Sequence, residues 1–324
     1  GNEYTSWEYK KMSELSQVNQ GLQIAIAERS EEPGENKYFY ITNEFLKKNS
    51  NKKYYIENPP SSVIATVDDI LMTRTGNTGI VVSNVEGVFH NNFFKINFDR
   101  KKLDKNFLIY YLNHPKTQNK ILILAGTSTI PDLNHKDFYS LDVPVPCLEE
   151  QQKIADFLSE VDNIIAMSEK EIESLEMQKK GAMQKIFSQE VRFKADDGSE
   201  YPEWEERSVK ELTTFHKQGY YTKEEYVNDG IKLARVSDLY NPKVDFDSMP
   251  MINMTEKDYE AFKVSLGDFL IARSGSIGRY GIVTTIPENV KVVFGSFVIK
   301  FNFDEKMLDI RYFGEFYSSD FAAR

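Results

Sequence analysis

One short pattern in the sequence combines residues that could bind a phosphate or the edge of a base. Residues 68–79 read DDILMTRTGNTG, and residues 267–278 read GDFLIARSGSIG. In both, an apolar run ends in an arginine, Arg74 or Arg273, followed by a hydroxyl residue and two glycines three positions apart. A guanidinium fork suits a phosphate or a guanine edge, and glycine allows close approach of another backbone. The pattern therefore predicts a strand, a loop able to contact nucleic acid, and a second strand.

The candidate contact residues come from these two loops and from polar stretches elsewhere in the chain. Lysine neutralises phosphates, whereas Asn and Gln can pair with adenine. We expect the following residues at a DNA surface: Arg74, Thr75, Gly76, Asn77, Arg273, Ser274, Gly275, Ser276, Arg279, Tyr280, Lys52, Lys53, Lys217 and Gln218. For the two arginines we favour phosphate over base, because one phrase used in two domains suits a common backbone. The alternative is a hairpin whose arginine pairs with a nearby carboxylate, such as Asp69 or Asp268.

The sequence offers few groups for catalysis or metal binding. Its four histidines show no ligand-like spacing, and its single cysteine, Cys147, excludes an internal disulfide and fits a reducing cytoplasm. No phosphate-binding P-loop and no dinucleotide fingerprint occurs. Residues 58–61, NPPS, lack the aromatic of an amino-methyltransferase site, and the Pro-Asp pair at 131–132 lacks the Glu-x-Lys of a metal-dependent nuclease. We therefore expect no catalytic residue, metal or cofactor in this chain.

The arginine phrase belongs to a longer internal repeat. Residues 7–15, WEYKKMSEL, match residues 204–212, and residues 95–112 match residues 300–317 at seven of 18 positions. With the phrase itself, the three matches occur in the same order at offsets of 197, 199 and 205 residues. This order predicts two homologous domains. Short branched and aromatic runs predict strands in both copies, and residues 103–125 predict a helix interrupted by a proline, so each copy should be a mixed α+β domain.

Residues 148–190, between the two copies, predict one long helix. Apolar residues recur at alternating steps of four and three, as in a coiled coil. The members that we expect to face a partner helix are Ile154, Leu158, Val161, Ile165, Ile172 and Leu175. About 40 helical residues make a rod of roughly 60 Å; the alternative is an amphipathic helix packed on its own domain. The expected division is thus a first domain at 1–147, the helix at 148–190 and a second domain at 191–324.

The negative charge of the chain is concentrated in the middle segment. The formal net charge is −10, but residues 1–147 are neutral, residues 148–200 carry −6 and residues 201–324 carry −4. Net charge bears on nonspecific association with nucleic acid rather than on fold. The overall sign therefore does not exclude DNA binding by the flanking domains. No apolar run reaches the about 20 residues of a membrane span, so we expect no membrane association.

Residues 143–162, VPVPCLEEQQKIADFLSEVD, resemble the central conserved region of type I restriction–modification specificity subunits. The repeated arginine phrase and the Trp-Glu openings of both copies are also similar to that family. The resemblance implies two target recognition domains, each reading one half of a bipartite site in double-stranded DNA. It implies helices that pack antiparallel, set the spacing and dock two methyltransferase (M) subunits, which motor-nuclease (R) subunits join. Adenine-N6 methylation, cleavage, S-adenosylmethionine, ATP and Mg would then belong to these partners, in the cytoplasm.

The second copy departs from the family pattern. By the offset of 205, Arg324 corresponds to Asn119, so the sequence stops before a counterpart of residues 126–133, GTSTIPDL, and of a second helix. We expect either a truncation or a naturally short form. Two rival classes remain. A stand-alone DNA-modifying enzyme would need a cofactor loop or an acidic metal cluster, and a coiled-coil adaptor that binds proteins but not DNA would show little salt dependence.

Overall fold

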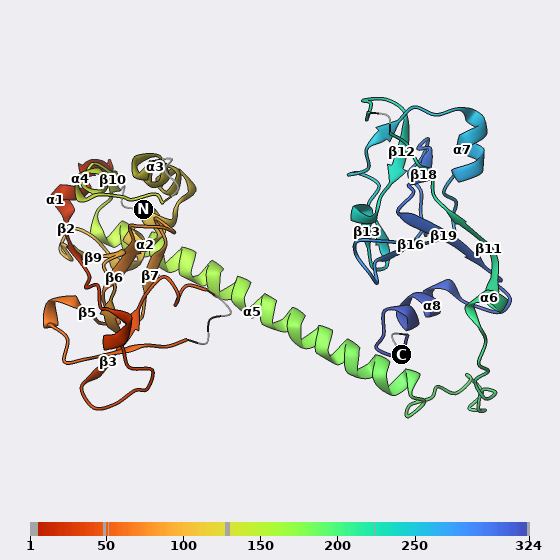
Figure 1. Cartoon of the computed structure of the whole chain (residues 1–324), viewed down its shortest axis with the longest axis horizontal. Helices are drawn as coiled ribbons and strands as arrows, with labels where there is room; N and C mark the ends of the chain where they lie inside the picture. Colours follow the sequence, from red (N-terminus) through yellow and green to blue (C-terminus); the bar gives the residue numbers. More distant parts are fainter. Residues whose placement is uncertain (1–5, 48–49, 51, 127–129, 224, 323–324) are drawn as a thin grey trace. The chain divides into compact units, whose positions relative to one another are not determined.

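A computed structural model of the chain describes residues 6–47, 50, 52–126, 130–223 and 225–322 (Figure 1). It divides into two compact units, residues 1–168 and 169–324. The long helix predicted between the repeats is confirmed as α5 (Leu148–Phe187), which has 40 residues. This helix does not form a unit of its own, because its first half belongs to the first unit and its second half to the second.

The first unit is built on two four-stranded sheets (Figure 1). One is antiparallel, in the order β2 (Ser16–Gln20), β9 (Phe93–Phe98), β6 (Ile70–Thr73), β7 (Val81–Ser83). The other is mixed, with β3 and β8 parallel, in the order β4 (Tyr55–Glu57), β3 (Lys37–Ile41), β8 (Gly87–Phe89), β5 (Ile64–Ala65). A further antiparallel pair joins the two ends of this copy, β1 (Glu8–Lys11) and β10 (Asp142–Val145).

Helices cover the antiparallel sheet of the first unit. They are α1 (Met12–Leu15), α2 (Lys105–Asn113), α3 (Pro115–Ala125) and α4 (His135–Tyr139), and short 3-10 turns occur at Ile26–Glu28 and Ser61–Val63. The predicted interruption of the 103–125 helix is confirmed. Pro115 takes the first position of α3, where the missing N–H costs nothing because that N–H has no partner within the helix.

The second unit repeats the antiparallel sheet in the order β11 (Thr213–Gln218), β19 (Val298–Phe303), β16 (Phe269–Ala272), β17 (Tyr280–Ile282). Its mixed sheet has the order β15 (Met251–Ile252), β12 (Ile231–Ala234), β18 (Val292–Phe294), with β12 and β18 parallel. The remaining elements are the hairpin β13 (Leu239–Tyr240) and β14 (Lys243–Val244), the helices α6 (Val209–Leu212), α7 (Glu256–Phe262) and α8 (Ile310–Tyr317), and the 3-10 turn η3 (Val236–Asp238).

Strand pairing confirms that the two units are copies of one fold. Ile70 lies opposite Ile96 in the first sheet, and Phe269 lies opposite Phe301 in the second. These pairs are related by the two offsets that the sequence matches gave. The central strand β6 has all four residues buried, because Ile70 contributes to one core and Leu71 to the other. This explains the apolar run before the arginine, since a strand covered on both faces loses the alternation of a half-exposed strand.

One strand end in each copy depends on glycine. A Cβ atom on Gly21 would lie 2.1 Å from the carbonyl oxygen of Phe89, and one on Gly219 would lie 2.2 Å from that of Gly295. Both distances are far below van der Waals contact and involve backbone, which cannot swing away. At each of these points the backbone passes so close to the neighbouring strand that only glycine, which has no side chain, fits.

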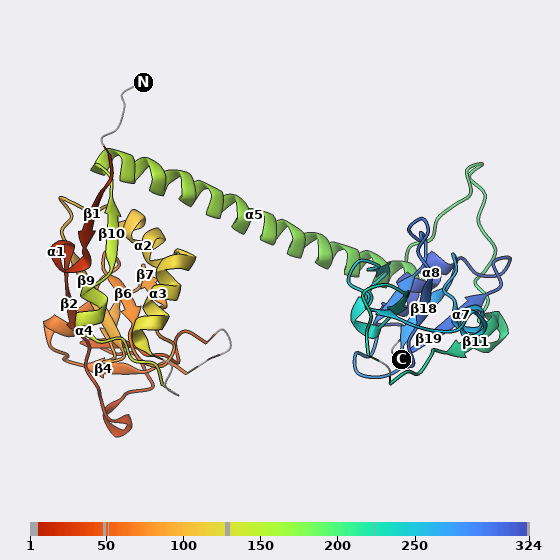
Figure 2. The same ribbon diagram turned by 90° about the horizontal axis from the view of Figure 1, so that it is seen from above.

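Gln151 anchors the start of α5 to the first unit. Its buried side chain accepts a hydrogen bond from the Asp104 N–H at 2.9 Å and donates to the carbonyl oxygens of Lys102 and Pro146, at 2.9 and 2.8 Å. Trp7, just before β1, donates to Glu150 at 3.0 Å. Figure 2 shows the start of α5 beside β1 and β10. The first turns of the helix are therefore fixed to their own domain.

Most of the predicted seam is exposed to solvent in the described part of the chain. Ile154 packs against the core of the first unit and Leu158 is half-buried. The next seam residues are exposed by 38 to 57%: Val161, Ile165, Ile172 and Leu175. The alternative of a helix packed on its own domain thus holds for the first turns, and the last turns pack on the second unit. At the C-terminal end of α5, Phe187 packs on Tyr312 and Phe316 of α8, with ring centroids 5.8 and 5.4 Å apart. Among the described helices, none is long and apolar enough to cross a membrane.

Candidate functional site

Arg74, in the first loop, is a largely buried residue with a structural partner. Its Nη2 donates to Oδ2 of Asp132 at 2.8 Å, and its guanidinium carbon lies 5.3 Å from the ring centroid of Phe94. Only 14% of the side chain is exposed. The alternative of an arginine paired with a carboxylate is therefore correct for this loop, but the expected partner was wrong. Asp69 instead accepts hydrogen bonds from the N–H and hydroxyl of Thr66, at 2.8 and 3.1 Å.

Pro131 and Asp132 hold the first loop in place by hydrogen bonds along its length. Asp132 pairs with Thr75 as an isolated β-bridge and accepts a short hydrogen bond from its hydroxyl. The carbonyl oxygen of Pro131 accepts from the Gly76 N–H at 3.1 Å and from the Thr78 hydroxyl at 2.9 Å. Residues 127–129 of the same segment lie outside the described residues. These contacts leave Asn77 as the exposed tip of the loop.

The second loop has the same backbone but a free arginine. The Arg273 N–H donates to the carbonyl of Phe297 at 2.8 Å, as the Arg74 N–H does to Asn92 at 2.7 Å. Arg273 is exposed, and its guanidinium forms no hydrogen bond or ion pair with the residues that the structure describes. The predicted alternative partner, Asp268, is buried and pairs with Lys300 at 3.2 Å instead. Under the offset of 205, the position equivalent to Asp132 lies beyond Arg324.

A cavity of about 600 Å³ opens beside the second loop. Ser274 and Gly275 of the loop form part of its wall, and the other polar or aromatic lining residues include Tyr220, Lys223, Tyr226, Arg235 and Ser296. Ser274 and Gly275 are among the DNA contacts expected from the sequence, whereas Tyr226 and Arg235 are not. Gln218 is at the rim, because its side chain donates to the carbonyl of Ser296 at 3.2 Å. Ser276 and Arg279 continue the loop, and Nη1 of Arg279 lies 3.4 Å from the Val236 carbonyl.

Two of the predicted contact residues have structural roles instead. Tyr280 is 1% exposed and stacks on Phe269 with ring centroids 5.2 Å apart, so we assign it to the core. Lys217 donates to the carbonyl of Ala261 at 2.8 Å, and its ammonium lies 3.8 Å from the ring centroid of Phe262. This lysine therefore attaches α7 to β11. Neither side chain is presented by the loops around the cavity.

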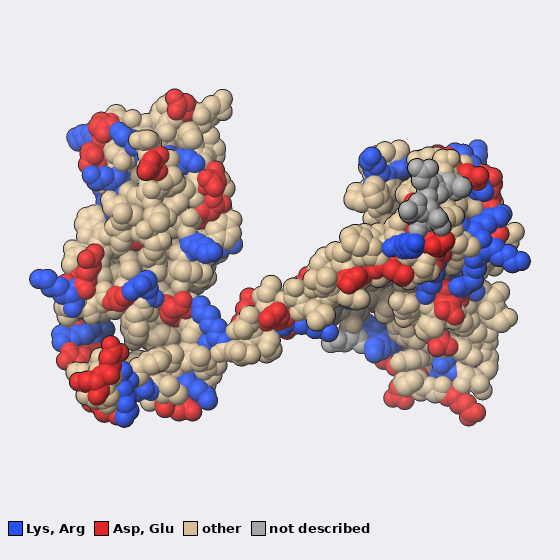
Figure 3. All heavy atoms as spheres, turned by 180° about the vertical axis from the view of Figure 1, so that it is seen from behind, with Lys and Arg blue, Asp and Glu red and all other residues tan. Residues whose placement is uncertain are grey.

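The lysines predicted in the first unit are exposed. Lys52 and Lys53 lie between β3 and β4, in a connection whose other end carries Asn43. The Asn43 amide donates to the carbonyl of Thr75 at 3.2 Å. The lysine-bearing connection and the first arginine loop are therefore joined in one surface region. On the face drawn in Figure 3, basic and acidic side chains are interspersed over both units.

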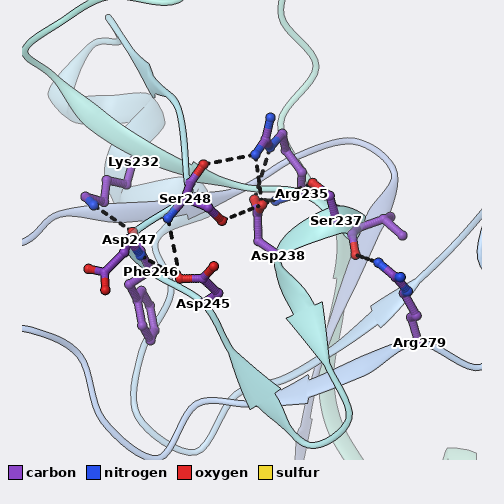
Figure 4. Close-up of polar contacts among 10 residues, drawn as sticks. Lys232, Arg235, Ser237, Asp238, Asp245, Phe246, Asp247, Ser248 and Arg279 are labelled. Carbon is purple, nitrogen blue, oxygen red and sulfur yellow. Dashed lines mark hydrogen bonds and ion pairs between the residues drawn. The ribbon is translucent and has the colours of Figure 1, made fainter. Parts of the chain in front are cut away.

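Arg235, the missed residue of the cavity wall, is held by a buried carboxylate (Figure 4). Its Nε and Nη2 donate to the two oxygens of Asp238, at 3.1 and 2.9 Å, and Nη2 also donates to the carbonyl of Ser248 at 3.0 Å. Asp238 is 1% exposed. Hydrogen bonding to Asp238, more than any other contact, raises the pKa of Arg235 above its usual range, so the guanidinium stays charged. Within the described residues, no group of three or more His, Cys, Asp or Glu side chains could hold a metal ion.

The fold and these loops define a protein with two equivalent recognition domains attached to one helix. Residues 4–177, more than half of the chain, match the family described as type I restriction modification DNA specificity domain, and the chain belongs to that family. It is 27% identical over 297 residues to the type I restriction enzyme MjaVIII specificity subunit of Methanocaldococcus jannaschii, covering 87% of this chain and 68% of that protein. It is also 23% identical over 257 residues to the EcoBI specificity subunit of Escherichia coli, covering 73% of this chain and 54% of that protein.

Solved structures show the same fold. The specificity (S) subunit of a type I restriction–modification system from M. genitalium superposes with a TM-score of 0.58 and 18% identity, over 100% of this chain and 80% of that one. A structure of a type I complex gives a TM-score of 0.50 and 14% identity, over 98% of this chain and 80% of the matched one. These likenesses confirm the predicted fold class of two mixed domains joined by a long helix.

Proposed function

We propose that this chain is the DNA-reading subunit of a type I restriction–modification complex and that each domain reads one half of a bipartite site. The observation that carries this proposal is the repeat itself. Two copies of one sheet, paired in the same register, each present an arginine loop at the end of the same central strand. A fold used twice on one connector suits a target with two half-sites. The family match over residues 4–177 supports the same function.

Exposed side chains of the two arginine loops are the proposed DNA contacts. Arg273 is exposed, and its guanidinium is proposed to contact a phosphate. Arg74 is already paired with Asp132, and its role is to hold the shape of its loop. Contacts to the first half-site then come from exposed side chains around that loop: Asn77, Lys52 and Lys53.

The exposed seam of α5 is the proposed contact surface for a partner helix, and the neighbouring faces of α5 are the proposed docking surface for the methyltransferase subunits. Four apolar side chains at coiled-coil spacing would each remove surface from water on contact with a partner helix. Adenine methylation and DNA cleavage are then carried out by the partners, which use S-adenosylmethionine, ATP and Mg. The chain itself supplies neither a catalytic residue nor a cofactor, and it works in the cytoplasm.

Adenine methylation mapping of the host genome, with this chain present and deleted, tests the proposal. The expected result is a bipartite methylated motif that disappears on deletion and returns on complementation. Purified chain without partners should transfer no methyl group from labelled S-adenosylmethionine. An unchanged methylation map would contradict the proposal, and binding of the assembled complex that is insensitive to salt would favour the coiled-coil adaptor instead, because a DNA reader loses affinity steeply as salt rises.

A further inference from the structure

Arg235 has N–H donors that its partners Asp238 and Ser248 do not use. A guanidinium has five N–H donors. Nε uses one on Asp238, and Nη2 uses one on Asp238 and one on the Ser248 carbonyl. Nη1 makes no hydrogen bond with Asp238 or Ser248, and its polar neighbour is the Tyr226 hydroxyl, from a residue that also lines the cavity. Figure 4 shows one guanidinium nitrogen of Arg235 pointing away from Asp238. Arg235 is therefore a fixed side chain whose remaining donors lie on the Tyr226 side, away from Asp238.

Asp238 is itself held in place, which makes the orientation of Arg235 rigid. Its carboxylate accepts hydrogen bonds from the Arg235 N–H at 2.8 Å, from the Ser237 hydroxyl at 3.0 Å and from the Ser248 hydroxyl at 3.3 Å. All of these groups lie in the short turn after β12 or in the adjoining loop. A buried carboxylate with this many donors has little freedom to reorient. The guanidinium is thus positioned before any ligand arrives.

The charge balance separates Arg235 from Arg273. Asp238 compensates the charge of Arg235, so Arg235 would attract a phosphate only weakly. What Arg235 can offer a ligand is a set of N–H donors with a fixed direction. Hydrogen bonds to acceptor atoms on a base edge require a well-oriented donor. Guanine presents two such acceptors, N7 and O6, in the major groove. Arg235 and Ser274 line the same cavity, which places the fixed donor beside the loop of the exposed Arg273.

The first unit has a different residue at the equivalent position. The Gly295 N–H donates to Ala234, and the His90 N–H donates to Ile41, both at 2.9 Å, so Ala234 and Ile41 are equivalent. The residue after Ala234 is Arg235, whereas the residue after Ile41 is Thr42. The same backbone position therefore offers a guanidinium in one domain and a hydroxyl in the other. Two half-sites of different sequence need this kind of difference.

We infer that Arg235 is a specificity-determining residue that reads a base acceptor, of the guanine N7 and O6 type, in the second half-site. This inference rests on the proposed function. The test uses the complex assembled with its methyltransferase subunits and a random double-stranded DNA library, from which methylated molecules are sequenced. For Arg235→Ala, discrimination at one position of the second half-site should fall by about 10- to 100-fold. The first half-site and the slope of affinity against salt should stay unchanged.

Two further variants keep the test decisive. Asp238→Asn retains every atom of Arg235 but weakens its fixation, and it should relax the same base position. Arg311→Ala is the matched control, because Arg311 forms a similar pair with Asp309 at 2.8 Å but is 78% exposed on α8. The complex with Arg311→Ala should show the same base preference as the unmodified complex. Thermal unfolding of each variant verifies that the second unit is folded.

The outcomes are distinguishable. A uniform loss of affinity for all sequences, with a smaller salt slope, would assign Arg235 to a phosphate and overturn the inference. So would an unchanged base preference in a folded Arg235→Ala complex. If neither the unmodified complex nor Arg311→Ala selected any motif, the proposed function itself would fail.

Discussion

Nη2 of Arg74 lies 2.8 Å from Oδ2 of Asp132, although 58 residues separate the two along the chain. The loop that carries Arg74 is therefore shaped by a segment from the far end of the same domain. Arg273 occupies the equivalent backbone position and is exposed.

We expect Asp132→Ala to destabilise the first unit. The substitution leaves the Arg74 guanidinium partly buried without its carboxylate, and its Nε already has no hydrogen-bond partner within the described chain. Loss of a partner for a buried polar group costs about 1–3 kcal/mol. Thermal unfolding should show a lower midpoint for the first unit. Arg273→Ala is the matched control and should leave the unfolding midpoint of the second unit unchanged, whereas equal effects of both substitutions would contradict these assignments.

Gln151→Leu should also destabilise the first unit. Leucine fills a similar volume but leaves the Asp104 N–H and the carbonyls of Lys102 and Pro146 without their present partner. We expect a cost of about 2–3 kcal/mol, measured by urea unfolding. Gln152→Leu changes the adjacent exposed residue and should stay within about 0.5 kcal/mol of the unmodified chain. A similar small effect at Gln151 would mean that this side chain does not anchor α5.

Ile165→Asp combined with Ile172→Asp should abolish assembly without unfolding either unit. Both residues are exposed, by 51 and 57%, so a charge at these positions costs the isolated chain little. In a packed seam the same charges would be buried without partners, at a cost of several kcal/mol. Co-purification with the methyltransferase subunit measures the loss. Asn163→Asp places one charge on the opposite face of α5 and should leave assembly intact; unchanged co-purification of the seam variant would show that assembly does not depend on the seam.

The stability of the second unit should depend on Asp309 in acid. Hydrogen bonding to the Arg311 side chain, then to the backbone N–H groups that begin α8, lowers the pKa of this carboxyl to about 2. A lowered pKa in the folded state means that the stabilisation is present above the unfolded value near 4 and is lost as pH falls toward 2. Asp309→Asn should therefore lower the unfolding midpoint at pH 7, and the difference should shrink as pH falls from 4 to 2. A difference that is constant over this range would contradict the role of the ionised carboxylate.

The repeat, the fold class and the long helix could be predicted because their patterns are local or recur along the chain. The heptad spacing of α5 and the proline within residues 103–125 are examples. The partner of Arg74 could not be predicted from proximity in sequence, because 58 residues, including α2 and α3, separate it from Asp132. The structural role of the Pro-Asp pair at 131–132, which holds the first arginine loop, could not be predicted from the sequence.

Exposure was the harder quantity to predict at the candidate site. Tyr280 follows the second loop directly and was expected at the DNA surface, yet its ring completes an aromatic core with Phe269. Arg235 was missed because a single Arg–x–x–Asp spacing resembles an ordinary surface pair. Only the burial of Asp238 distinguishes it, and burial depends on residues from several strands. The DNA contacts themselves stay predictions.

The close backbone approach at Gly21 and Gly219 also limits which positions of the duplicated domain can be substituted during evolution. The two copies of the domain can be compared with each other within one chain, and a residue that both share at a sterically restricted position has the same structural reason in each. Gln-Gly recurs at 20–21 and 218–219, where a Cβ atom would strike backbone. Thr42 and Arg235, one strand away, have diverged. Saturation mutagenesis should therefore find that both glycines tolerate no side chain, whereas substitutions at positions 42 and 235 alter the recognised sequence and leave the scaffold in place.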